Sequence, residues 1–224
     1  MYTELTQLPL LQGMNATDLA TIQKEAHIYN TQSGHTFCKQ GKICSSLVFI
    51  IKGSVTRRTV SPKGDFEFEE TVQAPWVIEP ESLYGLHCTY SSDYTSTEIC
   101  TLMTLSKQEI AKLFTKNDIF RMNYLNLLSA SLQRNRQDTI RPYTSCAEKR
   151  LLHFMESLSS FHFGSKKIKI KMEDLAEYMN ETRLRISRIL NKWQSLNLIQ
   201  LQRKEIHIPR FENLISHIIS TNTE

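Results

Sequence analysis

The glycines of this 224-residue chain lie almost entirely in its first part, where six of the seven occur within the first 85 residues. Short β-branched and aromatic runs lie between them, at 35–38, 47–51, 54–56 and 66–72. Before the last run, Pro62-Lys63-Gly64-Asp65 has the composition of a hairpin turn. Short strands at this spacing, separated by turn residues, predict a small antiparallel barrel or sandwich.

A helical pattern replaces the strands after residue 105. The last expected strand is 98–105, and Ser106 with Glu109 three residues later has the form of a capping box that starts a helix. We therefore expect a first, β-rich domain over residues 1–116.

The segment from 117 to about 139 contains neither glycine nor proline and predicts one long helix. Its apolar residues form two neighbouring stripes. The first stripe contains Ile119, Met122, Leu125, Leu128 and Leu132, and the second contains Phe120, Tyr124 and Leu127. Two stripes suit a helix that packs on its own domain and on a partner, or one that is simply well buried. Arg141 precedes Pro142, which disfavours helical backbone, so we place the connecting helix at 117–141 and a further domain at 142–224.

Charge is unevenly distributed, although the formal net charge is only +4. Residues 1–116 carry 10 Lys and Arg against 12 Asp and Glu, whereas residues 144–224 carry 13 against 9. The basic C-terminal part is the candidate for contact with a polyanion, although a chance fluctuation would give the same totals. No apolar run approaches the roughly 20 residues of a membrane span, and five cysteines without a C-x-x-C pair do not indicate a disulfide framework.

Residues 166–196 contain the most specific pattern. Lys166 to Lys171 alternates charged and apolar residues, which predicts a strand with one exposed, strongly basic face. Residues 172–179 have the apolar spacing of a helix. Asn180 tolerates the left-handed backbone of a tight turn, and Thr182 can cap a second helix over 183–196. The stripe expected to be buried in this second helix contains Ile186, Ile189, Leu190 and Trp193.

The opposite face of the second helix offers arginines and small polar side chains, which suit base edges and phosphates in a major groove. Residues 198–202 and 205–208 then alternate around Arg203-Lys204, which predicts a β-hairpin with a basic tip. Helix, tight turn, basic helix and basic hairpin, in this order, predict a winged helix-turn-helix that binds DNA. The candidate DNA-binding residues are Thr182, Arg183, Leu184, Arg185, Ser187, Arg188, Asn191, Arg203 and Lys204.

The stretch from Leu175 to Leu190 resembles the helix-turn-helix of the Crp/Fnr transcription regulators, and 196–199 resembles the entry to that family's wing. Residues 8–14 and 47–55 are similar to its entry helix and β-roll. The resemblance implies an α+β fold with a jelly-roll-like antiparallel β-roll that senses a signal, a long dimerisation helix and a winged helix-turn-helix. It also implies a homodimer, joined through the first stripe of the long helix, that binds a two-fold-related site on double-stranded DNA. The odd number of cysteines without a C-x-x-C pair makes a reducing cytoplasm the default location. RNA polymerase would be a further partner, and no enzyme activity is implied.

By position, Arg183 and Arg188 match the family's base- and phosphate-contacting arginines, and Ser187 matches a position used by some members. Leu184 departs from the glutamate that the family commonly has after the first arginine. A carboxylate accepts from the cytosine amino group, whereas leucine can only contact a thymine methyl group or fill space. We therefore expect a changed operator sequence.

Cyclic-nucleotide binding in this family implies a Gly-Glu pair, an arginine for the cyclic phosphate and a nearby small hydroxyl residue. The corresponding stretch has Glu79-Pro80 in place of Gly-Glu, and no arginine lies between Arg58 and Arg121. A phosphate beside carboxylates without that cation is unfavourable, which argues against cAMP. The candidate effector pocket contains Glu79, Glu81, Ser82, Tyr90, Ser91 and Ser92.

Other functions stay open at this point. His35, His87 and Cys88 are conceivable haem ligands, and Cys38, Cys44 or Cys88 could be a redox-sensing thiol. An iron–sulfur cluster would need four close ligands, and we predict no metal site. A cupin-like enzyme with a helical appendage would need a His-x-His cluster, which the seven histidines do not form. A protein-interaction module would leave the basic helix and hairpin unused.

Overall fold

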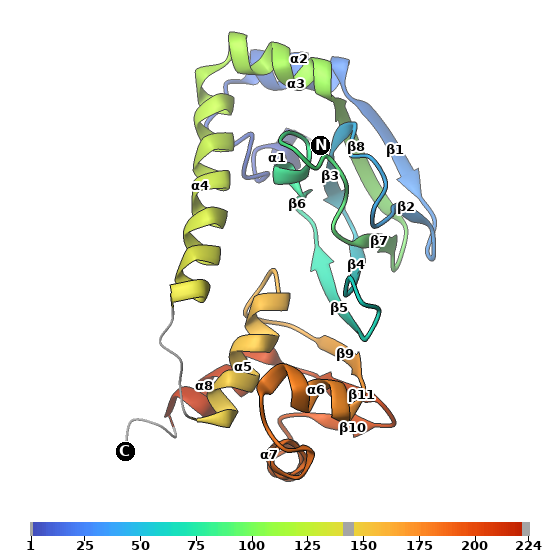
Figure 1. The fold of residues 1–224 in the computed structure, drawn as a ribbon. Helices are drawn as coiled ribbons and strands as arrows, with labels where there is room; N and C mark the ends of the chain where they lie inside the picture. Colours follow the sequence, from blue (N-terminus) through green and yellow to red (C-terminus); the bar gives the residue numbers. More distant parts are fainter. Residues whose placement is uncertain (1, 141–145, 221–224) are drawn as a thin grey trace. The chain divides into compact units, whose positions relative to one another are not determined.

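The computed structural model describes residues 2–140 and 146–220 (Figure 1). The chain divides into two compact units. The first unit contains Met1–Arg57 and Val72–Arg134, and the second unit contains Arg58–Thr71 and Asn135–Glu224. Residues 58–71, which lie inside the domain predicted over 1–116, therefore pack with the C-terminal part of the chain. The predicted boundary at Arg141-Pro142 lies outside the described residues.

The first unit is built from antiparallel strands and helices. Its helices are α1 (Tyr2–Leu5), α2 (Ala16–Glu25), the 3-10 helix η1 (Pro80–Ser82), α3 (Lys107–Lys116) and α4 (Asp118–Ile140), which continues into the second unit. Its strands are β1 (His27–Thr31), β2 (Thr36–Cys38), β3 (Ser46–Lys52), β4 (Ser54–Val60), β6 (Trp76–Ile78), β7 (Asp93–Ser96) and β8 (Cys100–Ser106).

One sheet of the first unit has the strand order β1-β8-β3-β6, and β4, β7 and β2 are neighbours in another. The apolar run Leu47 to Ile51 forms most of β3 and is buried on both faces, as expected for a continuous apolar strand. Among the described strands, neither sheet closes on itself. The closed barrel, one of the two forms predicted from the glycine spacing, is therefore wrong, and the fold is an open β-roll.

The capping box predicted at the start of α3 is confirmed. The Ser106 hydroxyl accepts a hydrogen bond from the Glu109 N–H at 3.3 Å, and the Glu109 carboxylate accepts from the Ser106 N–H at 2.5 Å. The two bonds satisfy backbone donors that a helix start leaves without partners. This junction fixes the point where the β-roll ends and the helices begin.

Helix α4 carries the two predicted stripes on different sides. In the second stripe Phe120 and Tyr124 are buried, and the Tyr124 hydroxyl donates to the Pro80 carbonyl at 2.5 Å, so this side packs on the first unit. Four members of the first stripe are exposed, namely Ile119, Met122, Leu125 and Leu132, and Leu128 is half-buried. The helix therefore packs on its own unit with one side and leaves an apolar side uncovered.

The second unit is a sheet packed against helices. Its elements are β5 (Phe66–Gln73), α5 (Ala147–Leu158), β9 (Lys166–Ile170), α6 (Met172–Met179), α7 (Arg183–Ser195), β10 (Gln200–Gln202), β11 (Glu205–Ile208) and α8 (Phe211–Ser220). The strand order is β10-β11-β9-β5, all antiparallel. Phe66 and Phe68 of β5 lie in the same hydrophobic core as Ile168 of β9 and Trp193 of α7.

The basic strand predicted at 166–171 is present as β9, but its charges are placed differently from the prediction. Lys167 and Lys169 are half-buried, and the side chain of Lys166 is 1% exposed, on the same face as the apolar Ile168 and Ile170. The Lys166 ammonium forms an ion pair with the buried Glu70 carboxylate of β5 at 2.5 Å. The prediction of an exposed basic face is therefore wrong for Lys166, because a strand from a distant part of the chain supplies its counter-ion.

Candidate nucleic-acid interface and sensor cluster

The turn between α6 and α7 has the geometry that the sequence predicts. Asn180 adopts a left-handed conformation with φ 48°, and the Glu181 N–H donates to the Ala176 carbonyl at 3.0 Å, which ends α6. The Thr182 hydroxyl accepts from the Arg185 N–H at 3.3 Å and caps α7. Two helices joined by so tight a turn have a fixed crossing, as a helix-turn-helix requires.

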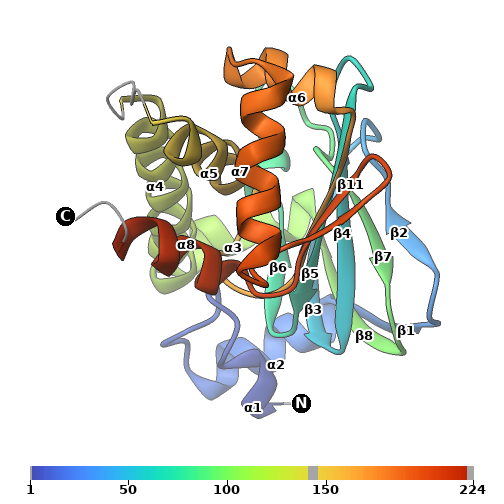
Figure 2. The ribbon, with the colours of Figure 1, turned by 90° about the horizontal axis from the view of Figure 1, so that it is seen from below.

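Helix α7 separates apolar from polar residues. Its predicted buried stripe is buried throughout: Ile186, Ile189, Leu190 and Trp193. On the opposite side Arg188 and Asn191 are exposed, and the Leu184 side chain is 61% exposed. Ser187 is half-buried between the two faces. Figure 2 shows α7 along its length, with α6 near one end and the β10–β11 hairpin beside it.

The first turn of α7 is basic and contains no acidic residue. A helix N-terminus carries partial positive charge, so arginines here add to it rather than offset it. The Arg183 guanidinium pairs with Glu173 at 3.2 Å across exposed surface, and the Arg185 guanidinium pairs at 3.1 Å with Glu181, whose side chain is only 9% exposed. A surface pair such as Arg183–Glu173 contributes about 0–1 kcal/mol, so an external anion can replace the Glu173 carboxylate.

Glu181, which was not among the predicted site residues, connects the turn to α5. Its carboxylate pairs with the guanidinium of Arg150 as well as with that of Arg185, and Arg150 also donates to the Met179 carbonyl at 3.3 Å. The tie holds the start of α7 in place. Arg188 is exposed, and within the described part of the chain no carboxylate pairs with it. Of the three arginines, Arg188 is thus the most open to a ligand.

The predicted wing is the β10–β11 hairpin. Arg203 and Lys204 are exposed at its turn, where Lys204 adopts a left-handed conformation with φ 60°. The Lys204 carbonyl accepts from the Ile170 N–H at 2.9 Å, so the wing is joined to β9. The nine predicted DNA-binding residues therefore lie in two adjoining places of the second unit, the first three turns of α7 and the wing tip.

Comparison with known proteins agrees with this geometry. Residues 149–216 match the Crp-like helix-turn-helix domain. The chain is 23% identical over 184 residues to Electron transport regulator A of Shewanella oneidensis, covering 79% of this chain and 72% of that protein. It is 22% identical over 191 residues to the Anaerobic regulatory protein of Haemophilus influenzae, covering 82% and 73%. Residues 149–216 are therefore a Crp-like helix-turn-helix domain, and the chain is a Crp/Fnr-type transcription regulator.

The fold of this Crp/Fnr-type regulator is that of the catabolite activator protein of Thermus thermophilus. The two share 16% sequence identity with a TM-score of 0.56, over 95% of this chain and 99% of that one. The first unit is thus a cyclic-nucleotide-binding-like domain, and the second contains the DNA-binding helix-turn-helix. Its relatives regulate transcription, and none of these matches favours the cupin-like enzyme.

The regulator's candidate effector residues gather around one carboxylate. Glu79 is buried in a left-handed conformation with φ 37°. It accepts from the Ser82 hydroxyl at 2.9 Å, from the Ser91 N–H at 2.7 Å and hydroxyl at 2.8 Å, and from the Tyr94 hydroxyl at 3.2 Å. Burial and then the Glu79 charge raise the pKa of Tyr94 well above its ordinary value, which keeps its hydroxyl a donor. We call Glu79, Ser82, Ser91 and Tyr94 the Glu79 cluster.

The other candidates lie outside the Glu79 cluster or at its edge. The Glu81 side chain is exposed, and the Tyr90 hydroxyl donates to the Ser46 carbonyl at 3.4 Å. The Ser92 hydroxyl accepts from the Arg57 guanidinium at 3.0 Å. The sequence does not indicate Arg57 as a pocket residue, because it lies in β4, outside the stretch that corresponds to the pocket. Tyr94 was missed as well, although its place in the polar run 90–96 was a signal.

The thiols considered for redox sensing include two deeply buried ones. Cys38 and Cys44 are both buried, and burial raises the pKa of Cys38 to about 12 and the pKa of Cys44 above its ordinary value. Cys88 is half-buried, with its sulfur 3.8 Å from the Lys107 ammonium. In the described residues no three His, Cys, Asp or Glu side chains are grouped to hold a metal ion. The described helices include none long and apolar enough to span a membrane.

Proposed function

We propose that this Crp/Fnr-type regulator binds a two-fold-related site on double-stranded DNA as a homodimer, through the exposed face of α7. The observation that carries the proposal is the open guanidinium of Arg188 on a helix whose opposite face is fully buried. An arginine fork can donate two hydrogen bonds to the O6 and N7 atoms of guanine, and Asn191 can pair in the same way with adenine. Arg183 and the capped N-terminus at Thr182 suit a backbone phosphate.

The uncovered apolar stripe of α4 supports the homodimer. Ile119, Met122, Leu125 and Leu132 are exposed along one helix side, and apolar stripes of this kind pair with a second helix. Two copies related by a two-fold axis would present two α7 helices to two half-sites. We also propose contact with RNA polymerase, as the family resemblance implies, a cytoplasmic location, as the cysteine pattern indicates, and no enzyme activity.

The sensor is proposed not to use cAMP in the classical way. The Glu79 carboxylate already accepts from the serine and tyrosine donors that an anionic ligand would need. Displacing it would leave a buried carboxylate without these donors, which is costly. Titration calorimetry with cAMP and cGMP should therefore give no micromolar binding. A binding isotherm with a micromolar Kd would contradict this part of the proposal.

The proposal for α7 is tested by a mobility-shift assay with DNA selected from a random duplex library. Arg188→Ala should weaken binding by about 1–3 kcal/mol and relax the base preference at one position of each half-site. The matched control is Arg210→Ala, which removes an exposed arginine of the same unit beside the other end of β11 from the wing tip. Equal affinities of wild type and Arg188→Ala, with the same recovered sequences, would remove Arg188 from the interface.

The same selection tests the role of Leu184. The exposed leucine suits contact with a thymine methyl group, so the recovered half-site should differ from the one that glutamate at this position selects. Leu184→Glu should shift the preference toward cytosine at the contacted position. Identical consensus sequences for the two proteins would show that this side chain does not contact a base.

A further inference from the structure

The β4–β5 hairpin enters the DNA-binding sheet beside the wing. Residues Phe66 to Glu70 pair with β9 in the register Phe66↔Ile170 to Glu70↔Lys166, and β9 pairs with β11 on its other edge. Phe66, Ile170 and Lys204 therefore lie in one row across the sheet. Because adjacent strands lie about 4.8 Å apart, the hairpin turn at 61–65 and the wing turn leave the same end of the sheet roughly 10 Å from each other (Figure 1).

The hairpin is held to this sheet by its core and by buried charge. The Phe66 ring contacts the rings of Phe154 and Tyr178, each with 5.6 Å between centroids. Glu70 pairs with Lys166 and accepts from the Ser160 N–H at 2.9 Å. Breaking a buried pair costs several kcal/mol, so the hairpin is a fixed part of the DNA-binding unit.

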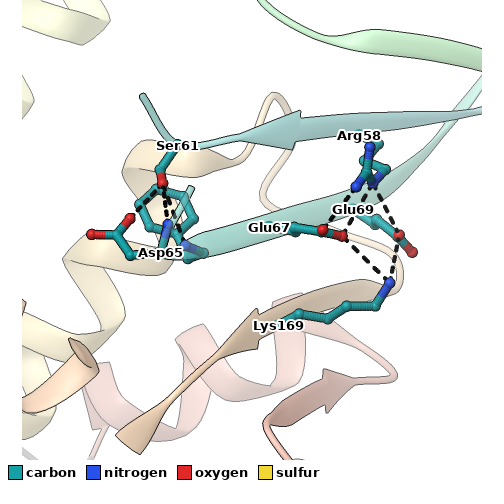
Figure 3. A network of polar contacts seen from close by, with 7 residues as sticks. Arg58, Ser61, Asp65, Glu67, Glu69 and Lys169 are labelled. Atoms are coloured by element: carbon teal, nitrogen blue, oxygen red, sulfur yellow. Dashed lines mark hydrogen bonds and ion pairs between the residues drawn. The ribbon is translucent and has the colours of Figure 1, made fainter. Parts of the chain in front are cut away.

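On the face of β5 and β9 that points away from the hydrophobic core, the carboxylates of β5 form ion pairs with basic side chains. The Arg58 guanidinium contacts Glu67 at 2.8 Å, and the Lys169 ammonium contacts Glu69 at 3.3 Å and Glu67 at 3.5 Å (Figure 3). Arg58, with Lys169 of β9, thus neutralises the two acidic side chains of β5 on this face. The acidic residues of the strand therefore do not surround the hairpin turn with open negative charge.

The hairpin turn itself is rigid and is pinned to the helix-turn-helix. The Ser61 hydroxyl accepts from the Asp65 N–H at 3.1 Å and donates to the Asp65 carboxylate, and the Gly64 N–H donates to the Ser61 carbonyl at 2.9 Å. The Tyr178 hydroxyl of α6 donates to the same Asp65 carboxylate at 2.8 Å. These bonds present Lys63, which is exposed, at the apex of the turn.

We propose that the β4–β5 hairpin is a second wing of the DNA-binding unit, with Lys63 contacting a backbone phosphate. Two turns with exposed basic side chains, Lys63 in Pro62-Lys63-Gly64-Asp65 and Arg203-Lys204 in the wing, leave one end of one sheet, and the first is tied to α6 of the helix-turn-helix through Asp65. A preorganised lysine beside a DNA-binding helix and wing needs no ordering of the chain to meet the backbone. The inference rests on the proposed DNA binding by α7 and adds a contact that carries affinity but no base preference.

The test is the salt dependence of binding to a mixed-sequence duplex, measured by fluorescence anisotropy with the full chain. Each phosphate contact contributes about 0.9 to the slope of log K against log salt, so Lys63→Gln should lower the slope by about 0.9. Between roughly 50 and 200 mM salt, this variant should lose about 3.5-fold less affinity than wild type. Lys63→Arg, which retains the charge, should keep the wild-type slope.

The control is Arg210→Gln, which removes one positive charge of the same unit beside the opposite end of β11 and should leave the slope unchanged. If Lys63→Gln keeps the wild-type slope of log K against log salt, the proposal that the β4–β5 hairpin is a second wing is wrong. If wild type binds with a steep slope and Arg188→Ala weakens binding, the proposed function survives that result. If wild type has a slope near zero, the proposed DNA binding is wrong, and the proposal of a second wing is wrong as well.

Discussion

The Glu79 cluster of the first unit and the exposed face of α7 in the second differ in how far the chain satisfies their polar groups. Glu79 is buried, and three side chains and a backbone N–H donate to its carboxylate. On α7, Arg183 pairs with a surface carboxylate, the exposed Arg185 pairs with the Glu181 carboxylate of the turn, and Arg188 is exposed to solvent. A buried network is costly to disturb, whereas surface pairs are exchanged easily.

The difference predicts where substitutions act. Changes in a closed network should lower the free energy of unfolding, because they leave buried groups without partners. Changes on the open face should lower DNA affinity and hardly change stability. The Glu70–Lys166 pair separates the effect of burial from the effect of the unit, since it belongs to the DNA-binding unit but is as buried as Glu79. If burial decides the effect of a substitution, changing this pair should lower the free energy of unfolding, as changing Glu79 should.

The largest effect is expected for Lys166→Met. It leaves the Glu70 carboxylate in the core without the Lys166 ammonium, which should lower the free energy of unfolding by about 3–5 kcal/mol. Urea unfolding followed by the fluorescence of Trp193, fully buried in the second unit, measures it in a Trp76→Phe background. The double variant Glu70→Leu/Lys166→Met should recover most of the loss. A loss below about 1 kcal/mol for the single variant would show that the pair is not buried in solution.

A smaller effect is expected for Glu79→Gln. The amide keeps one acceptor but turns an NH2 group toward donors, which should cost about 1–3 kcal/mol of stability. Calorimetric unfolding measures the loss, and the salt slope of DNA binding should not change. Glu98→Gln, an exposed substitution in the same unit, should stay within about 0.5 kcal/mol of wild type. Equal stability of the two variants would show that the Glu79 cluster is open rather than closed.

The smallest effect concerns the buried thiols of the first unit. With the pKa of Cys38 raised to about 12, roughly one molecule in ten thousand carries the thiolate at pH 8, the form that reacts. Cys38 should therefore resist Ellman's reagent in the native protein and react fully after unfolding in urea, as mass spectrometry of the labelled peptides would show. Rapid native labelling of Cys38 would instead favour the redox-sensing alternative.

The local elements were predictable because each is specified by residues close together in the sequence. Thr182 and Asn180 mark the helix-turn-helix, Ser106 and Glu109 mark α3, and apolar spacing of three and four residues marks the buried stripe of α7. The nine candidate DNA-binding residues follow from the same periodicity, and their contacts with DNA remain a prediction.

The long-range contacts could not be predicted in the same way. β5 and β9 are separated by about 100 residues, and strand register over such a distance depends on the whole fold. A signal was present, since Glu67 and Glu69 alternate with apolar residues as Lys167 and Lys169 do. Opposite charges in two alternating strands favour pairing, but many other segments compete. Arg57 was missed for a related reason, because β4 brings it to Ser92 from outside the sequence stretch that defines the pocket.

The buried partner of Lys166 has a consequence for protein engineering. A chimera that joins the helix-turn-helix of this chain to another sensor at residues 141–142 would take Lys166 but not Glu70, and Ile168 but not Phe68. The recipient would have to supply a hairpin of matching charge and register, or the grafted part would carry a buried ammonium and an uncovered sheet edge. The portable module is therefore discontinuous in sequence, comprising Arg58–Thr71 together with the C-terminal part.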